Sequence, residues 1–171
     1  GLSNNEEILS AGDVGTYKDL NTLIKGTEAN DVLVLDRNYK YDSSIDSSFS
    51  DGIIITKAIT IDGAGNTISG NNIARLFVIN ANNVVLKDLN IVDTTASTPG
   101  GAIIWNGNNG KLINSNFNNT ILTITGNKDG GGAIYWKGAD GYVETSVFNN
   151  AKGANGGAIE LMGINFKINN C

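Results

Sequence analysis

Short apolar runs separated by Gly and Asn recur along this chain, and three of them are copies of one another. Residues 100–107 read GGAIIWNG, and they return as GGAIYWKG at 131–138 and as GGAIELMG at 156–163. Behind the first two copies, SNFNN at 115–119 matches SVFNN at 146–150. Repeats of about 20 to 50 residues are typical of solenoids, in which each unit buries its apolar side only by stacking on its neighbours.

The period of the repeat predicts the kind of solenoid. One matching apolar position per unit gives successive steps of 25, 26, 31 and 25 residues, and these positions are Ile61, Leu86, Leu112, Val143 and Ile168. About 25 residues suffice for three short strands with turns between them, and coils would stack at about 4.8 Å. The signature and the helical half of a leucine-rich repeat are missing. We therefore predict an all-β fold, a parallel β-helix (β-solenoid) with coils of about 25 residues.

Alternation within the repeats predicts which side chains face the core. Because successive residues of a strand point to opposite faces, and a buried carboxylate would be costly, Glu160 and Ala158 should face water. The positions then expected inside are Ile103, Trp105, Ile134, Trp136, Ser115, Ser146, Phe117 and Phe148. Ile104, Tyr135 and Glu160 should form an outward column, with Tyr142 facing outward on the next strand.

Asn-Asn pairs occur at 82–83, 118–119 and 149–150, where we expect the chain to leave a strand and turn. Asn tolerates left-handed backbone conformations, and stacked Asn side chains form amide ladders. The segment 118–120 also matches a glycosylation sequon, but the turn explains the same residues.

The N-terminal part has a helical pattern instead. Thr16 and Asp19 have the spacing of a capping box, and Gly26 is a helix-stop signal. The apolar stripe of this helix comprises Tyr17, Leu20, Leu23 and Ile24. A solenoid exposes its core at each end unless a terminal unit covers it, so we expect this helix to cap the first coil.

We expect one β-helix domain over 1–171, with an N-terminal cap at 11–30, degenerate coils at 31–99 and the Gly-Gly-Ala-Ile repeats at 100–171. Residues 42–51 are rich in Ser and Asp and predict a surface loop. The sequence stops inside a repeat, from which we expect a fragment of a longer protein. An unpaired sheet edge at that end would favour end-to-end self-association.

Composition narrows the function classes. The net charge is −5 without a basic cluster, which argues against nucleic acid and anionic membrane surfaces as partners. One Cys allows no disulfide framework and no Cys-based metal site. No apolar run approaches the roughly 18 residues that a membrane span needs, and residues 1–10 are no signal peptide. We expect no cofactor and no membrane insertion.

An enzyme is a competing hypothesis, because a fold does not settle function. The chain has no His, and its only two arginines are Arg37 and Arg75. The best pair of carboxylates is Asp62 and Asp88 on consecutive coils, next to Lys87. Because Asp62 faces Lys87 in register, a cross-strand ion pair explains Asp62 better than catalysis does. We therefore predict no catalytic residues. A polysaccharide lyase or glycosidase and a purely structural stalk stay open as alternatives.

The order of these segments also suggests a family. A helix and a strand are followed by ITIDGAGNTISG at 59–70, by VVLKDLNI at 84–91 and by the Gly-Gly-Ala-Ile repeats. From about residue 16 onward this closely resembles the adhesin-like surface proteins of gut methanogenic archaea, and the repeats are similar to those of chlamydial polymorphic outer-membrane proteins. The resemblance implies a right-handed β-helix in a secreted, extracellular adhesin, anchored to the cell envelope through regions outside this chain. It implies contact with glycans or proteins of other cells.

Binding specificity in such a protein would lie in loops, which carry function on a rigid scaffold. The connections 93–99, 120–129 and 151–155 should emerge along one edge and differ in length, although drift in loop length explains the variation equally. The outward aromatic residues suit sugar stacking. The candidate ligand contacts are Thr120, Thr123, Thr125, Asn127, Lys128, Asp129, Tyr135 and Tyr142.

Overall fold

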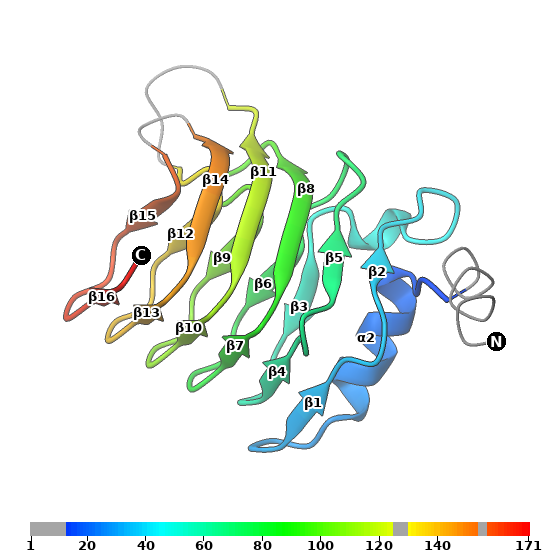
Figure 1. Ribbon diagram of the computed structural model, residues 1–171, viewed down its shortest axis with the longest axis horizontal. Coiled ribbons are helices and arrows are strands. Elements are labelled where there is room, and N and C mark those ends of the chain that lie inside the picture. The colour runs from blue at the N-terminus through cyan, green and yellow to red at the C-terminus, as the bar shows by residue number, and fades with distance from the viewer. Residues whose placement is uncertain (1–12, 125–129, 154–156) are drawn as a thin grey trace, which may run out of the picture.

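The protein is a parallel β-solenoid with one short helix at its N-terminal end (Figure 1). The computed structural model describes residues 13–124, 130–153 and 157–171. All strand pairs in this part of the chain are parallel, and each joins a coil to the next one. The predicted fold class is thereby confirmed.

The strands form three sheets. Sheet 1 has the order β1 (Val32–Val34), β4 (Thr60–Asp62), β7 (Val85–Lys87), β10 (Lys111–Ile113), β13 (Tyr142–Glu144) and β16 (Lys167–Asn169). Sheet 2 has the order β14 (Val147–Lys152), β11 (Asn116–Leu122), β8 (Asn90–Ala96), β5 (Thr67–Ser69) and β2 (Tyr39–Lys40). Sheet 3 has the order β15 (Ile159–Leu161), β12 (Ile134–Trp136), β9 (Ile103–Trp105), β6 (Phe77–Ile79) and β3 (Ile53–Ile55).

The predicted register is confirmed in every coil of sheet 1. Leu112 pairs with Leu86 below it and with Val143 above it, and Val143 pairs with Ile168. Ile61, Leu86, Leu112 and Val143 are fully buried in one column. Each coil therefore places one apolar side chain directly over the equivalent side chain of the preceding coil.

Aromatic side chains and serines stack in the interior as the alternation predicts. The rings of Trp105 and Trp136 are stacked with centroids 4.0 Å apart, and those of Phe117 and Phe148 with centroids 4.8 Å apart. The buried Ser146 Oγ accepts a hydrogen bond of 3.2 Å from Ser115 N. The two serines thus satisfy backbone donors inside an otherwise apolar column.

The expectation that the chain turns at Asn118 and Asn149 is wrong. Strands β11 and β14 run on to Leu122 and Lys152, and Asn118 pairs with Asn149 within sheet 2. The left-handed backbone expected of these Asn pairs is nevertheless present at the second residue of each, Asn119 and Asn150. The equivalent kinks are Asp93, Asn119 and Asn150, with φ of 55°, 58° and 53°. Because the kink shifts the alternation by one position, the residue after it faces the core.

Left-handed residues also form the corners of the solenoid, where Asn and Asp tolerate the positive φ. One column turns the chain from sheet 3 into sheet 1 and comprises Asn83, Asn109, Asp140 and Asn165. A second column turns it from sheet 1 into sheet 2 and comprises Asp88, Asn114 and Thr145. The predicted turn at 82–83 is thus confirmed.

A column of glycines recurs at one corner of the solenoid because the backbones of successive coils pack closely there. A Cβ atom on Gly138 would lie 1.8 Å from the carbonyl oxygen of Gly107, and one on Gly163 would lie 1.9 Å from that of Gly138. Coils can approach at this corner only because these positions have no side chain.

Helix α2 (Tyr17–Gly26) covers the first coil (Figure 1). Its capping box of Thr16 and Asp19 is present as predicted, and it packs against β2 and β3. Tyr17, Leu20 and Ile24 are buried, whereas Leu23 is 38% exposed. The predicted cap is therefore present, and the buried apolar stripe of the helix has three residues instead of the four expected.

The loop at 42–51 contributes to this cap, which the sequence did not predict. It contains the short helix η1 (Ser47–Phe49) and the fully buried Asp46. The Asp46 carboxylate accepts hydrogen bonds from Tyr17 N at 3.0 Å and Lys18 N at 2.9 Å. It therefore binds the unpaired amides of the first turn of α2.

Candidate functional site

The predicted loop edge exists. Strands β8, β11 and β14 are neighbours in sheet 2, so the connections that follow them leave the solenoid along one edge, at the upper left in Figure 1. The connections begin later than expected, because the three strands continue to Ala96, Leu122 and Lys152. The first residues assigned to each loop are therefore part of the sheet.

This extension corrects one candidate contact. Thr120 follows the kink of β11 and is fully buried, so its side chain faces the core and not a ligand. Thr123 is exposed, and its hydroxyl donates a hydrogen bond of 3.1 Å to the Ala96 carbonyl. The candidates Thr125, Asn127, Lys128 and Asp129 lie outside the described residues.

Tyr135 lies on the outer face of sheet 3, in register with Ile104 on one side and Glu160 on the other, as predicted. The ammonium group of Lys137 lies 5.9 Å from the centroid of the Tyr135 ring, within the range of a cation–π contact. The Glu160 carboxylate accepts a hydrogen bond from Gly130 N, at the end of the connection from β11 to β12. An aromatic ring, a cation and a carboxylate thus meet at the base of the connection from β11 to β12.

Tyr142 does not belong to this group, because it lies on β13 and faces outward from sheet 1. A hydrogen bond to the Glu144 carboxylate raises the pKa of the Tyr142 hydroxyl. The two candidate tyrosines therefore belong to different sheets.

The residues weighed for catalysis are engaged in structural contacts. Lys87 Nζ lies 3.9 Å from the Asp62 carboxylate, which confirms the expected ion pair. Asp88 Oδ1 accepts a hydrogen bond of 2.7 Å from Asn114 Nδ2. Among the described ranges there is no group of three or more His, Cys, Asp or Glu placed to hold a metal ion.

Arg75 is buried, and this burial lowers the pKa of its guanidinium group. Its guanidinium donates to the carbonyls of Gly100 at 2.7 Å, Thr98 at 2.8 Å and Asp51 at 3.1 Å. It therefore fixes the end of the connection between β8 and β9, and its donors bond to backbone carbonyls and to the Thr98 hydroxyl.

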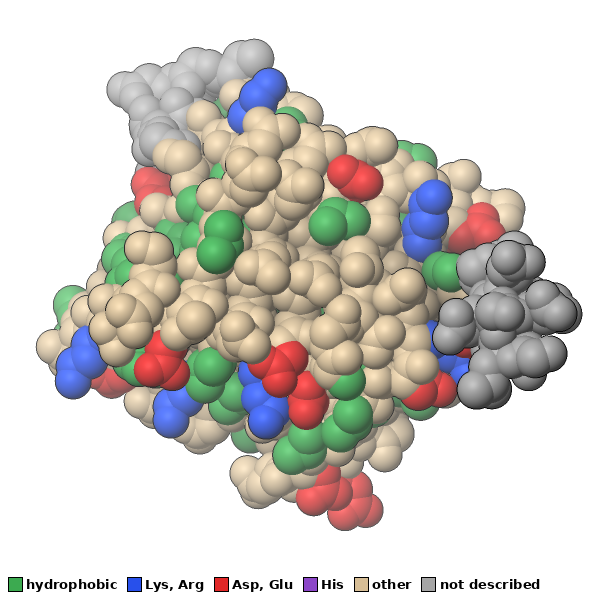
Figure 2. All heavy atoms as spheres, in the orientation of Figure 1, with side chains coloured by type: hydrophobic (Ala, Val, Ile, Leu, Met, Phe, Trp, Pro, Cys, Tyr) green, Lys and Arg blue, Asp and Glu red, His purple; other side chains and the backbone are tan. Residues whose placement is uncertain are grey.

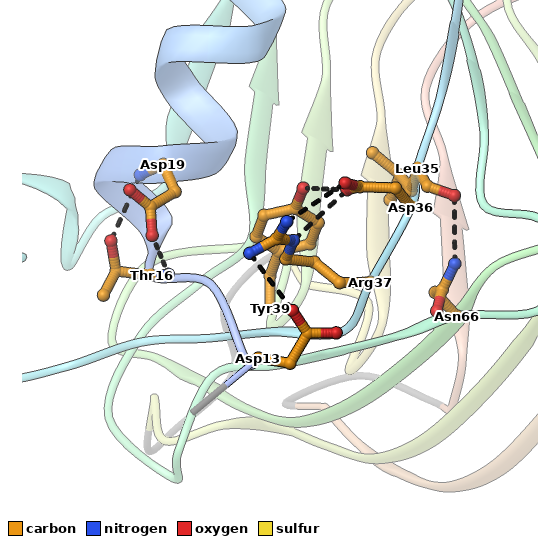
Figure 3. A network of polar contacts seen from close by, with 8 residues as sticks. All are labelled: Asp13, Thr16, Asp19, Leu35, Asp36, Arg37, Tyr39 and Asn66. Atoms are coloured by element: carbon orange, nitrogen blue, oxygen red, sulfur yellow. Dashed lines mark hydrogen bonds and ion pairs between the residues drawn. The ribbon is translucent and has the colours of Figure 1, made fainter. Parts of the chain in front are cut away.

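Arg37 belongs to a polar network beside α2, which no sequence signal indicated (Figure 3). It forms ion pairs with Asp36 at 3.2 Å and with Asp13 at 3.4 Å, and the Tyr39 hydroxyl donates to Asp36 at 3.1 Å. The hydrogen bond from Arg37 holds the pKa of Asp36 below its usual range. The network borders a cavity of about 300 Å³ next to Asp19 on the helix.

The outer face of sheet 2 carries rows of asparagines that bond from coil to coil. Asn116 Nδ2 donates to Asn90 Oδ1 at 3.1 Å, and Asn149 Nδ2 donates to Asn118 Oδ1 at 3.3 Å. At the kinks, Asn119 Nδ2 donates to Asp93 Oδ1 at 2.8 Å. The predicted amide ladders are thus present, and the rows on β8, β11 and β14 lie in the middle of a sheet and not at its turns.

No helix among the described residues has the length and the apolar character needed to cross a membrane. Comparison with protein-family models, with curated proteins and with solved structures found no match for this chain. The resemblance to archaeal adhesin-like proteins therefore stays a prediction from the repeats.

Proposed function

We propose that this protein is an extracellular, cell-surface adhesin-like protein whose β-helix mediates attachment to glycans or proteins of other cells. In this proposal the chain is held at the cell envelope through regions outside it. The observation that carries the proposal is a constant stacked core combined with connections of unequal length along one edge of sheet 2.

The lengths of these connections support a binding role for the edge. Between β8 and β9, and between β14 and β15, six residues separate the strands, whereas eleven separate β11 from β12. The paired strands on either side keep their register across the longer insertion. Loop length can therefore change without a change of the core, which is how a rigid scaffold presents variable binding segments.

The chemistry at the base of the connection from β11 to β12 suits a sugar. The Tyr135 ring offers a face for stacking on the apolar side of a pyranose. Lys137 and the Glu160 carboxylate, next to it, supply a donor and an acceptor for hydroxyl groups. This group is the first site to test.

The test is binding to a glycan array and to whole cells, with wild-type protein and two variants. In the first variant, residues 123–133 are replaced by the six-residue connection 97–102, which already joins the same two sheets. The second is Tyr135→Ala. We expect wild-type binding and its loss in both variants, with unchanged circular dichroism. Full binding by both variants would remove the loop edge as the site.

Two further measurements separate the alternatives. We expect no new reducing ends and no unsaturated products when the protein is incubated with pectin-like and other polysaccharides; either product would indicate a glycosidase or a lyase. A wild-type protein that binds no cell and no glycan would instead support a structural stalk.

A further inference from the structure

The outer face of sheet 2 is a flat surface of mostly uncharged side chains over several coils. In the register of β5, β8 and β11, the outward positions are Thr67, Ser69, Asn90, Val92, Thr95, Asn116, Asn118 and Ile121. Figure 2 shows this face, where the tan of uncharged polar groups and backbone dominates the middle of the view. The charged side chains are Lys40 of β2 and Lys152 of β14 at its borders, and Asp93 at the kink of β8, whose carboxylate accepts a hydrogen bond from Asn119 Nδ2.

The asparagines on this face are held in place before any ligand arrives. Asn116 Nδ2 donates to Asn90 Oδ1 at 3.1 Å, and Asn90 Nδ2 donates to the Gly65 carbonyl at 2.9 Å. In the neighbouring row, Asn118 Oδ1 accepts from Asn149 Nδ2 at 3.3 Å. Because the ladder restricts these side chains to one geometry, binding to them costs less conformational entropy than binding to free amides.

The ladder leaves hydrogen-bonding groups for a ligand. A primary amide has two N–H donors and two acceptor lone pairs. The bond to Asn90 occupies one N–H of Asn116, and the bond from Asn149 occupies one lone pair of Asn118. Each exposed amide therefore presents donors and acceptors to solvent, and equivalent amides on successive coils repeat at about the 4.8 Å strand spacing.

We propose that the outer face of sheet 2 binds an uncharged linear polysaccharide along the solenoid axis. Sugar hydroxyls both donate and accept, as the amides do, so a neutral polymer satisfies both halves of each amide. A polymer with regular units can also meet equivalent amides on two consecutive coils, Asn90 and Asn116 in one row and Asn118 and Asn149 in the other. Few charges on the face give an ionic polymer little to pair with. This inference rests on the proposed function and names a second surface and a ligand class for it.

The proposal is tested by co-sedimentation with insoluble polymers. The neutral probes are microcrystalline cellulose, chitin and mannan, and the charged probes are polygalacturonate gel and chitosan. We expect binding to at least one neutral probe, with little change as salt is raised. The variant Asn116→Ala/Asn118→Ala should bind about tenfold or more weakly, because it removes two amides that the ligand contacts.

Two further variants separate ligand contact from stability. Val92→Arg places a long side chain in the middle of the face and removes no ladder amide, so it should also weaken binding. Asn80→Ala/Asn106→Ala removes an equivalent ladder, with a bond of 2.7 Å, at the end of the sheet 3 strands. It should destabilise the protein about as much as the sheet 2 variant and bind as wild type.

Wild-type binding by both face variants would overturn the inference, as would binding to the charged probes alone or to no polymer. Its failure is distinguishable from failure of the proposed function. If the loop replacement abolishes attachment to cells while the face variants attach normally, the outer face of sheet 2 is not the binding surface, and the proposed adhesin function is retained. If the protein sediments with a neutral polymer but attaches to no cell, polysaccharide binding by the outer face of sheet 2 is supported and the proposed adhesin function is rejected.

Discussion

The two ends of the solenoid differ in how far their apolar side chains are buried. At the N-terminal end, helix α2 covers the first coil, and Tyr17, Leu20 and Tyr39 are almost fully buried. In the coil of β14, β15 and β16, each strand has one neighbouring strand, and Ile168 is 53% exposed although the equivalent Val143 is fully buried. An apolar side chain is therefore buried when its coil is covered on both sides, by another coil or by the helix. The sequence of the coil itself is not sufficient.

The same comparison explains why the helix matters more than its length suggests. Asp46 binds its first turn and Lys57 donates to the carbonyls of Lys25 and Thr27 at its other end, so both ends of α2 are attached to the first coils. A cap that is fastened at both ends closes the core where a further coil would otherwise be needed.

The largest expected effect comes from opening the capped end. Leu20→Asp places an unpaired charge against the core and should cost about 4 kcal/mol or more, so that the protein unfolds or aggregates. Leu23→Asp lies on the same helix at a 38% exposed position and is the control, with a small change in melting temperature. Equal melting temperatures for the two variants would mean that α2 is not a cap.

The next effect compares the middle of the solenoid with its last coil. Leu112→Ala removes a fully buried side chain between two coils and should cost about 2 to 5 kcal/mol. Ile168→Ala, two coils further in the same column, should cost less than about 1 kcal/mol because its side chain is half exposed. Denaturant titration measures both, and a loss at Ile168 as large as at Leu112 would contradict the comparison.

A smaller effect is expected where backbones meet. The Cβ of Gly138→Ala would clash with the Gly107 carbonyl, so the coils must separate, at a cost of about 1 to 3 kcal/mol. Gly157→Ala, where a Cβ would meet no atom within 4 Å, is the matched control and should be near neutral. Thermal melting distinguishes them, and two neutral variants would show that the corner can relax freely.

The smallest effect is a dependence on alkaline pH at the capped end. Burial, together with the hydrogen bond to Asp36, raises the pKa of Tyr39 to about 12. Between pH 10 and 12 the unfolded chain releases this proton while the folded protein keeps it, so stability is complete below pH 10 and falls as pH rises. Tyr39→Phe should reduce this slope in denaturant titrations at pH 9 to 12. An unchanged slope would assign the effect to other groups, such as Tyr17, whose pKa burial also raises.

The stacking register could be predicted because the repeats carry it. Aligning the copies places Trp136 over Trp105 and Phe148 over Phe117, and both stacks are present. Cys171 occupies the position of the buried serines in the last coil, and its thiol donates to the Asn169 carbonyl two residues back, as the Ser115 hydroxyl donates to the Ile113 carbonyl. Where one coil copies another, local pattern is enough.

The sequence predicts side-chain orientation wrongly where a local change of backbone conformation shifts the alternation. It does not predict contacts between residues far apart in the chain. Strict alternation predicts that Ala158 faces water, but its equivalents Ala102 and Ala133 are fully buried, because they lie in a bend before the strand begins. The positive φ of Asn119 moved Thr120 inward in the same way. Asp46 finds its partner amides 28 and 29 residues away, at a distance that composition cannot reveal.

The candidate site was predicted in part. The loop edge and the outward register of Tyr135 followed from the repeats, and the exposed Thr123 lies on that edge. The contact of Glu160 with Gly130 depends on a turn that the pattern does not encode. The Asn pairs at 118–119 and 149–150 predict turns, but their left-handed residues only kink strands that continue beyond them.

Amide hydrogen exchange, followed residue by residue, tests the central claim that each coil is stabilised by neighbours on both sides. The account predicts the slowest exchange in β4, β7, β10 and β13, protected amides in the first coil under α2, and the fastest strand exchange in β16. Uniform protection along sheet 1, or a first coil that exchanges as fast as the last, would contradict it.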